Sequence, residues 1–255
     1  MKKELLVLTL LILIIVGFSG CIDLGNNSYG PEVRSYFEDK YNANDDTILS
    51  VSTVNGGISI SSWHGANIFL NATKKSRNGE DDLDKAEIVV TENVNQIHIE
   101  VQHDQPINSR AVDLDIKIPY NVSVKTVIST NGGIVVENVE GYVTATTTNG
   151  GIVIKNTTGI DNLISTNGGI NAEILDIQKD VNIQSTNGGI NLDIKSTLNS
   201  SIQISTTNGR ITVGGDFISV SESSYKSFKG TIGNGGNTIN VLTTNGGITV
   251  NELKV

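Results

Sequence analysis

The stretch Thr130-Asn131-Gly132-Gly133-Ile134 recurs along this chain and decides its fold. Identical copies occupy 148–152, 166–170, 186–190 and 244–248, and two variants occupy 54–58 and 207–211. From Asn131 onward the motif asparagines are separated by 18, 18, 20, 21 and 37 residues, and the last interval reads as two steps with one degraded copy between them. Self-similarity with a period near 20 residues is typical of proteins built from stacked repeats.

Aligning the copies on the asparagine separates positions that point inward from positions that point outward. The residues four before it and three and five after it are apolar in every copy, as in Val127, Ile134 and Val136. The residue two before it is always Ser or Thr, as in Ser129. Such period-2 alternation is typical of strands with one buried face, so we expect these columns to line the interior.

The apolar positions change phase across Gly-Gly, which predicts a corner between two strands. Glycine adopts positive φ at the least steric cost, so we expect it to turn the chain there. Stacking would place each asparagine about 4.8 Å from the next, where amide side chains can form a hydrogen-bonded ladder. We therefore expect a structural role rather than ligand binding for the motif asparagines, which are Asn55, Asn131, Asn149, Asn167, Asn187, Asn208 and Asn245.

Two arrangements are compatible with the motif. Asn-Gly is a strong hairpin signal, which allows a meander of antiparallel hairpins. Near-identity at each place in the repeat favours like stacked on like, and hence an all-β, single-chain parallel β-solenoid (β-helix-like) with Asn-Gly-Gly corners. We expect roughly ten coils and a rod of about 50 Å. The solenoid domain is expected at 48–255, with looser coils at 48–120 and regular repeats at 121–250.

Composition limits the partners. The formal net charge is −9 and no cluster of Lys or Arg stands out. Phosphate binding needs a concentrated basic face, so nucleic acid and anionic membrane surfaces are disfavoured as partners. Cys21 is the single cysteine, which excludes an internal disulfide or a cysteine-based metal cluster.

The N-terminal segment indicates export. Two lysines precede an apolar run at 5–18, and small residues follow it. A basic start, a short apolar core and small residues before a cleavage site indicate a secretory signal peptide at 1–20.

The cysteine that follows this segment suggests a lipid anchor. Phe18-Ser19-Gly20-Cys21 resembles the lipobox of prokaryotic lipoproteins, although Phe18 departs from the usual aliphatic residue. The resemblance implies cleavage before Cys21 and lipid attachment to its thiol, which would anchor the protein to the cell membrane. An ordinary signal peptide with a chance cysteine and an uncleaved anchor are the alternatives. Residues 21–47 are then a lipid-anchored tether with a candidate first strand at 31–41.

Catalytic chemistry finds little support in the sequence. Parallel β-helix enzymes that cut acidic polysaccharides need clustered carboxylates and basic residues that face the substrate. Carboxylates in the repeats, such as Glu137 and Glu173, occupy no single column. The acidic run at 80–84 lacks the glycine placement of an EF-hand and is interpreted as a solvated loop rather than a Ca²⁺ site. We expect no catalytic residues, no metal site and no cofactor.

Three features of the chain point to a family. They are the opening repeat at 49–60, the tryptophan Trp63, and a strand at 112–124 that contains Pro119. Over about 48–255 the chain resembles a family of prokaryotic exported domains labelled "putative adhesins", whose function is uncharacterised. The resemblance implies a β-solenoid fold and brings no catalytic residues. The second turn residue is Gly here, where family turns commonly carry Asp or another polar residue, which weakens any idea of an acidic ladder that binds cations.

Two functions from different classes follow as hypotheses. In the first, the protein is exported, anchored to the outer face of the cell membrane by lipid at Cys21, and acts as a non-catalytic interaction or adhesion-like module. Its partner would be a surface polysaccharide or an envelope protein, with the face around Trp63 as the candidate binding surface. In the second, the anchored rod is a structural or stress-associated envelope protein. A polysaccharide-active β-helix enzyme is a distant third.

Overall fold

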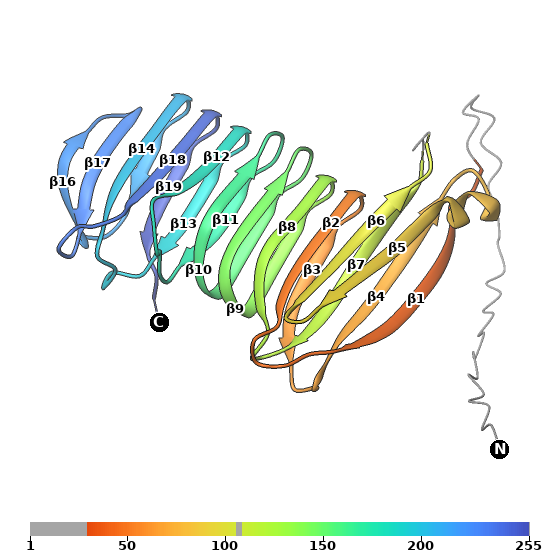
Figure 1. Cartoon of the computed structure of the whole chain (residues 1–255). Coiled ribbons are helices and arrows are strands. Elements are labelled where there is room, and N and C mark those ends of the chain that lie inside the picture. Colours follow the sequence, from red (N-terminus) through yellow and green to blue (C-terminus); the bar gives the residue numbers. More distant parts are fainter. Residues whose placement is uncertain (1–29, 106–108, 255) are drawn as a thin grey trace, which may run out of the picture.

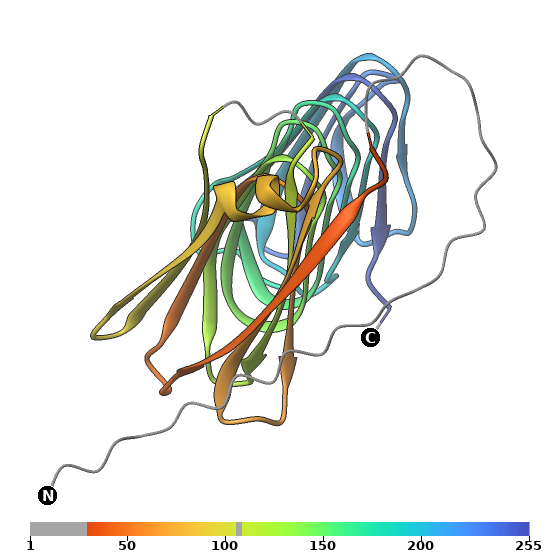
Figure 2. The same cartoon turned by 90° about the vertical axis from the view of Figure 1, so that its right-hand side faces the viewer.

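The structure, a computed structural model, confirms the all-β class. It describes residues 30–105 and 109–254, so the expected signal peptide and Cys21 lie outside the described residues. The described chain forms nineteen strands, β1–β19, and one short 3-10 helix, η1 (Glu80–Lys85). Figure 1 shows the strands stacked side by side along one long axis. In Figure 2 the successive turns lie behind one another, with η1 at the near end.

The strands form two layers that enclose the core. The upstream layer, named for the strands that precede an Asn-Gly-Gly turn, contains in spatial order β5 (Ala86–Asn93), β6 (Gln96–His103), β2 (Ile48–Asn55), β8 (Ser123–Asn131), the second halves of β9 (Ile134–Thr147) and β10 (Ile152–Ser165), β12 (Val181–Asn187), β18 (Thr238–Asn245), β14 (Ser200–Asn208), β17 (Ser227–Ile232) and β16 (Ile218–Ser223). The downstream layer contains β1 (Val33–Asn42), β4 (Asn67–Ser76), β7 (Ala111–Pro119), β3 (Ile58–Trp63), the first halves of β9 and β10, β11 (Ile170–Ile174), β13 (Ile190–Ile194), β19 (Ile248–Glu252) and β15 (Ile211–Val213).

Neighbouring repeats pair in parallel and in register. Ile152 lies opposite Ile134 on one side and opposite Ile170 on the other. Antiparallel pairs lie at the two ends, where β1, β4 and β7 pair with one another, β5 pairs with β6, and β14, β17 and β16 pair in turn. The mostly parallel sheet is the arrangement that like-on-like repeats predict.

The core consists of the columns that the alignment places inward. Val127, Ile134 and Val136 are fully buried, as are their counterparts in most other repeats. Ile211 and Val213 are only partly buried, because β15 lies at the edge of its layer and pairs on one side with β19. The prediction of the core is confirmed apart from this last layer.

The buried Ser/Thr column has a hydrogen-bonding role. Ser165 Oγ donates to the carbonyl oxygen of Gly150, and Thr147 Oγ1 to that of Gly132, each at 2.9 Å. Counting these two, six turns contain such a bond from a Ser or Thr hydroxyl to a glycine carbonyl oxygen. A buried carbonyl without a partner is costly, so each hydroxyl satisfies the turn beside it.

The turn glycines permit close approach rather than a left-handed backbone. Among the glycines of the motif, all of which are described, Gly56 alone has a positive φ, at 132°. A Cβ added at Gly132, Gly150 or Gly168 would lie 1.9, 2.1 or 2.0 Å from the carbonyl oxygen of a glycine in the neighbouring turn. The expectation of positive φ is therefore wrong for the other turns. Glycine is required at the first of the two glycine positions, because adjacent turns pack too closely there to admit a side chain.

The order of repeats in space differs from their order in the sequence. β18 lies between β12 and β14, and β19 lies between β13 and β15, so the repeat at 238–252 is inserted into the stack. At the other end β2 lies between β6 and β8 in the same manner. The interval between Asn208 and Asn245 holds no degraded copy of the motif. It holds the antiparallel hairpin β16–β17, which pairs with β14.

Candidate interaction surface

The seven motif asparagines form one continuous row of hydrogen bonds. In each bond the Nδ2 of one amide donates to the Oδ1 of the next, over 2.6–2.9 Å. The spatial order is Asn55, Asn131, Asn149, Asn167, Asn187, Asn245 and Asn208. At one end Asn55 Nδ2 donates to the carbonyl oxygen of Arg110 at 3.2 Å. These bonds join neighbouring turns, which supports a structural role for the row.

Beside this row the upstream layer presents a surface without charge. Three uncharged side chains point outward, between the buried columns, along each of the seven strands β2, β8, β9, β10, β12, β18 and β14. These residues, which we call the uncharged face, are Ser50, Ser52, Val54, Thr126, Ile128, Thr130, Thr144, Thr146, Thr148, Asn162, Ile164, Thr166, Asn182, Gln184, Thr186, Asn240, Leu242, Thr244, Gln203, Ser205 and Thr207. Thr148 and Thr166 are included although they lie one residue beyond the ends of β9 and β10. Seven adjacent strands span about 29 Å.

Charged residues bound this face. Glu100 on β6 pairs with Ser52 at one side, and Lys229 on β17 pairs with Gln203 at the other. Lys125 immediately precedes Thr126 at a β-bulge near the start of β8, at the margin of the face away from the asparagine row. The absence of charge is therefore a property of the face rather than of the whole surface.

The downstream layer of the same stack is charged. Lys155 and Glu137 are opposite each other on β10 and β9, 3.6 Å apart, and Glu173 is opposite Asp193 on β11 and β13. The upstream and downstream layers of the same repeats therefore differ in the charge of their outward side chains, although both layers pair in parallel and in register.

Trp63, the residue singled out by sequence, lies at the end of β3. Its indole N–H donates to the carbonyl oxygen of Asn67 at 2.9 Å, and its ring leaves no room for a Cβ at Gly65. The indole therefore packs against the turn that leads into β4 as well as reaching the surface. Beside it, the rings of His64 and Tyr120 meet edge to face with centroids 5.1 Å apart. This pair has no signal in the local sequence, because only the pairing of β3 with β7 brings the two residues together.

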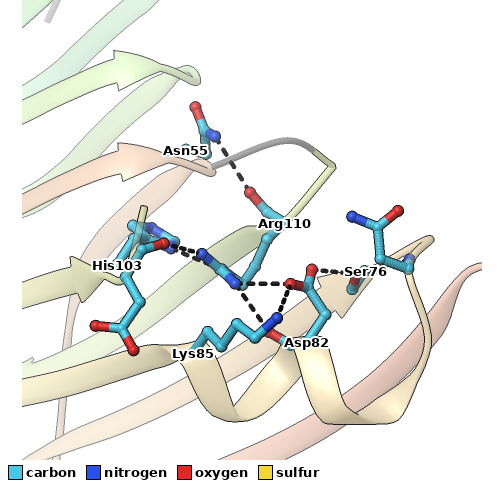
Figure 3. A network of polar contacts seen from close by, with 8 residues as sticks. Asn55, Ser76, Asp82, Lys85, His103 and Arg110 are labelled. Atoms are coloured by element: carbon cyan, nitrogen blue, oxygen red, sulfur yellow. Dashed lines mark hydrogen bonds and ion pairs between the residues drawn. The ribbon is translucent and has the colours of Figure 1, made fainter. Parts of the chain in front are cut away.

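The acidic run at 80–84 is not a solvated loop. It forms η1, and Asp82 is buried within it. As Figure 3 shows, Arg110 Nη1 lies 2.8 Å from Asp82 Oδ1, and Ser76 Oγ donates to Asp82 Oδ2 at 2.7 Å. Arg110 is 1% exposed and also donates toward the Nδ1 of His103 at 3.4 Å. The network joins η1 to β4 and β6 and closes this end of the stack.

Two groups in the network have shifted pKa values. The hydrogen bond from Ser76 holds the pKa of Asp82 below its ordinary value, and the charges of Arg110 and Lys85 act in the same direction against the effect of burial. Burial, together with the neighbouring Arg110 guanidinium, lowers the pKa of His103. At neutral pH both shifts favour an ionised Asp82 and a neutral His103, the charge states that suit a buried guanidinium.

Two negative findings apply to residues 30–105 and 109–254. No three His, Cys, Asp or Glu side chains gather there closely enough to bind a metal ion. No helix in these ranges has the length and hydrophobicity needed to span a membrane.

Comparison with known proteins gives a family. Residues 40–251 match the Toastrack DUF4097 family. No curated protein matches the sequence. Similar solved structures include a "putative cell adhesion protein" from Clostridium sporogenes, with 12% identity, a TM-score of 0.45 and coverage of 87% of this chain and 100% of that one. A "putative adhesin" from Bacteroides fragilis has 13% identity, a TM-score of 0.40 and coverage of 86% and 97%.

A further similar structure is a "putative lipid binding protein" from Parabacteroides distasonis, with 13% identity, a TM-score of 0.31 and coverage of 87% and 97%. The family match spans most of the chain and includes the repeats on which the sequence resemblance depends. The protein therefore belongs to the Toastrack DUF4097 family.

Proposed function

We propose that this protein is an exported lipoprotein, anchored at the outer face of the cell membrane through Cys21, that acts as a non-catalytic, adhesion-like interaction module. The lipobox-like Phe18–Cys21 supports the anchor. The backbone N–H of Gly30 donates to the backbone carbonyl oxygen of Arg77 at 3.1 Å, so the described chain begins at the end of the stack that carries η1. The nine residue steps from Cys21 to Gly30 could reach about 30 Å, which would hold that end close to the membrane.

The uncharged face is the observation that carries the interaction role. The chain has a net charge of −9, yet the outward positions that define the uncharged face carry no charged side chain. Water can be removed from that area at low cost, because no ion has to be desolvated there. The cores of protein interfaces are likewise depleted in charged residues. The hydroxyl and amide groups of the face supply hydrogen bonds, while Ile128 and Leu242, which are 42% and 41% exposed, supply apolar contact.

A neutral, extended partner fits this surface best. Its flat, repetitive rows suit a polymer, and a strongly charged partner would gain no complementary charge from it. We therefore propose a neutral surface polysaccharide as the ligand and an uncharged patch of an envelope protein as the second choice. The proposal includes no turnover.

A pair of matched variants tests the role of the face. Thr146→Glu places a carboxylate in the middle of the uncharged face, and Thr249→Glu places one at a half-buried outward position in the downstream layer. Full-length protein would be tested for binding to insoluble neutral cell-wall polysaccharides and to fractionated envelope proteins. We expect Thr146→Glu to weaken binding at least tenfold and Thr249→Glu to leave it unchanged.

Two outcomes would contradict the proposal. If both variants bind as the wild type does, the uncharged face is not the binding surface. If the wild type binds nothing, the alternative of a structural or stress-associated envelope protein is favoured. The anchor is tested separately, because Cys21→Ser should move the protein from the membrane fraction to the soluble fraction and abolish labelling by a lipid precursor.

A further inference from the structure

A depression of about 450 Å³ lies at the bends of β9 and β10, half a repeat away from the Asn-Gly-Gly turns. We call it the corner depression, and its lining includes Ser62, Tyr120, Asn138, Glu140, Asn156 and Thr158. β3 pairs with both β7 and β9, and β9 pairs with β10, so residues from four segments meet there. It lies apart from the positions that define the uncharged face.

Two asparagines in left-handed conformations form part of the lining. Asn138 and Asn156 have φ values of 58° and 46°, a region that few residues other than glycine and asparagine adopt readily. The Nδ2 of Asn156 donates to the Oδ1 of Asn138 at 2.8 Å, which fixes both amides. Within the described residues, the bond leaves the amide nitrogen of Asn138 and the amide oxygen of Asn156 for a ligand. The lining therefore offers both a donor and an acceptor.

A hydroxyl and a carboxylate extend this polar set. Thr158 Oγ1 donates to Glu140 Oε2 at 2.5 Å and accepts the backbone N–H of Gly141 at 3.1 Å. Glu173 accepts the backbone N–H of Asn156 at 2.9 Å, which brings a second carboxylate to the margin. The Glu140 carboxylate in the lining and the Glu173 carboxylate at its margin, with no cation in the lining, disfavour an anionic ligand because like charges repel.

Tyr120 supplies an aromatic wall. It is 52% exposed, and the edge-to-face contact with His64 holds its ring in place. Tyr120 also lines a second depression of about 360 Å³, which Trp63 and His64 share. An amphipathic ring beside hydrogen-bonding side chains suits a ligand with one apolar face and a polar rim.

We infer that the corner depression binds a single neutral hexose unit of a polysaccharide. The C–H face of a pyranose would lie against Tyr120, and its hydroxyls, which both donate and accept, would pair with the Asn138 and Asn156 amides and with the Glu140 carboxylate. This inference rests on the proposed function, since it specifies the class of polymer and adds a second contact site. It predicts selection against uronic acids.

The single tryptophan of the chain makes binding observable. Because Trp63 lines the adjoining depression, all tryptophan emission comes from the neighbourhood of the site. Full-length protein would be titrated with tetramers of glucose, mannose, galactose and N-acetylglucosamine, with tetragalacturonate as the anionic comparator. Calorimetry of the same titrations supplies a readout that does not depend on Trp63. We expect saturable binding of at least one neutral tetramer and none of tetragalacturonate.

Matched tyrosine variants locate the site. Tyr120→Ala should raise the Kd for the bound tetramer at least tenfold. Tyr225→Ala, which removes a ring that is 70% exposed and lies over Arg210 near β15, should change it less than twofold. Circular dichroism melting would check that both variants remain folded. Asn156→Asp, which keeps the side-chain size and adds a negative charge, should also weaken binding.

The inference can fail while the proposed function stands. If calorimetry detects no neutral tetramer at millimolar concentration although Thr146→Glu abolishes polymer binding, the inference is overturned. Equal affinity of wild type and Tyr120→Ala would place the sugar elsewhere and overturn it too. Preferential binding of tetragalacturonate would overturn the neutral class.

Discussion

Asp82→Ala should destabilise the end of the stack that η1 closes. Arg110 is 1% exposed, and its Nη1 lies 2.8 Å from the Oδ1 of Asp82, so the guanidinium stays buried when the carboxylate is lost. Removing one partner of a buried ion pair costs about 3–5 kcal/mol. We expect about 4 kcal/mol, because the carbonyl oxygens of residues 82 and 104 still accept from Arg110 while Ser76 loses its acceptor.

Hydrogen exchange is the assay for this cost, because stacked repeats can open locally. At about 1.4 kcal/mol per factor of ten, a loss of 4 kcal/mol should speed exchange in β4, β6 and β7 by about 1,000-fold where exchange proceeds through this opening. Amides in β13, in the half of the stack away from η1, should keep wild-type protection. The double variant Asp82→Leu with Arg110→Met removes both charges and should recover most of the loss.

The same contact predicts a pH dependence. The folded-state pKa of Asp82 is lower than its ordinary value of 3.8, so its stabilisation is present above that value and is lost as pH falls through the folded-state pKa. In Asp82→Ala this acid-sensitive component should be absent. A change of less than tenfold in the exchange of β4, β6 and β7 on Asp82→Ala would refute the reasoning, since a buried and paired guanidinium cannot lose its carboxylate at so little cost.

Three further predictions concern single positions. Gly168→Ala should lower the free energy of unfolding by about 3 kcal/mol, because its Cβ would lie 2.0 Å from a backbone carbonyl oxygen. At Gly169 the corresponding distance is 3.2 Å, so Ala should cost less than about 1 kcal/mol there, and urea denaturation compares the two variants. Ser165→Ala should cost about 1–3 kcal/mol in the same assay by leaving the carbonyl of Gly150 unsatisfied, and Ser165→Thr should restore it. The folded-state pKa of His103 is lower than its ordinary value of 6.5, so the wild type should lose stability as pH falls below 6.5 toward that folded-state value. His103→Gln should abolish this loss, which urea titrations at a series of pH values would measure.

The repeated motif predicted the layers and the core because each strand carries its own pattern. Burial of the column that contains Val127 follows from alternation alone, and parallel pairing follows from identity between repeats. The order of repeats could not be predicted in this way. The segments around Asn187, Asn208 and Asn245 are similar enough to stack in any order, so the inserted position of β18 depends on connections rather than on local sequence.

Residues of the corner depression and of the η1 network were missed for a different reason. Their partners are distant in sequence, as in the contact between Asp82 and Arg110. A local signal for the corner existed: Asn-x-x-Gly occurs at 138–141 and again at 156–159, which marks a second bend in each repeat. The side chains that gather at such a bend, such as Tyr120, can be identified only once the strand pairing is known.

The insertion of β18 and β19 affects how the molecule is made. Residues 238–252 leave the ribosome after β12, β13, β14 and β15, between which they lie. Until they arrive, these strands lack a shared neighbour and the interior between them is open to water. Assembly therefore cannot proceed by adding one turn for each repeat synthesised, and its late step is a long-range one. A protease that cuts just before residue 238 would open the stack in its interior instead of shortening it.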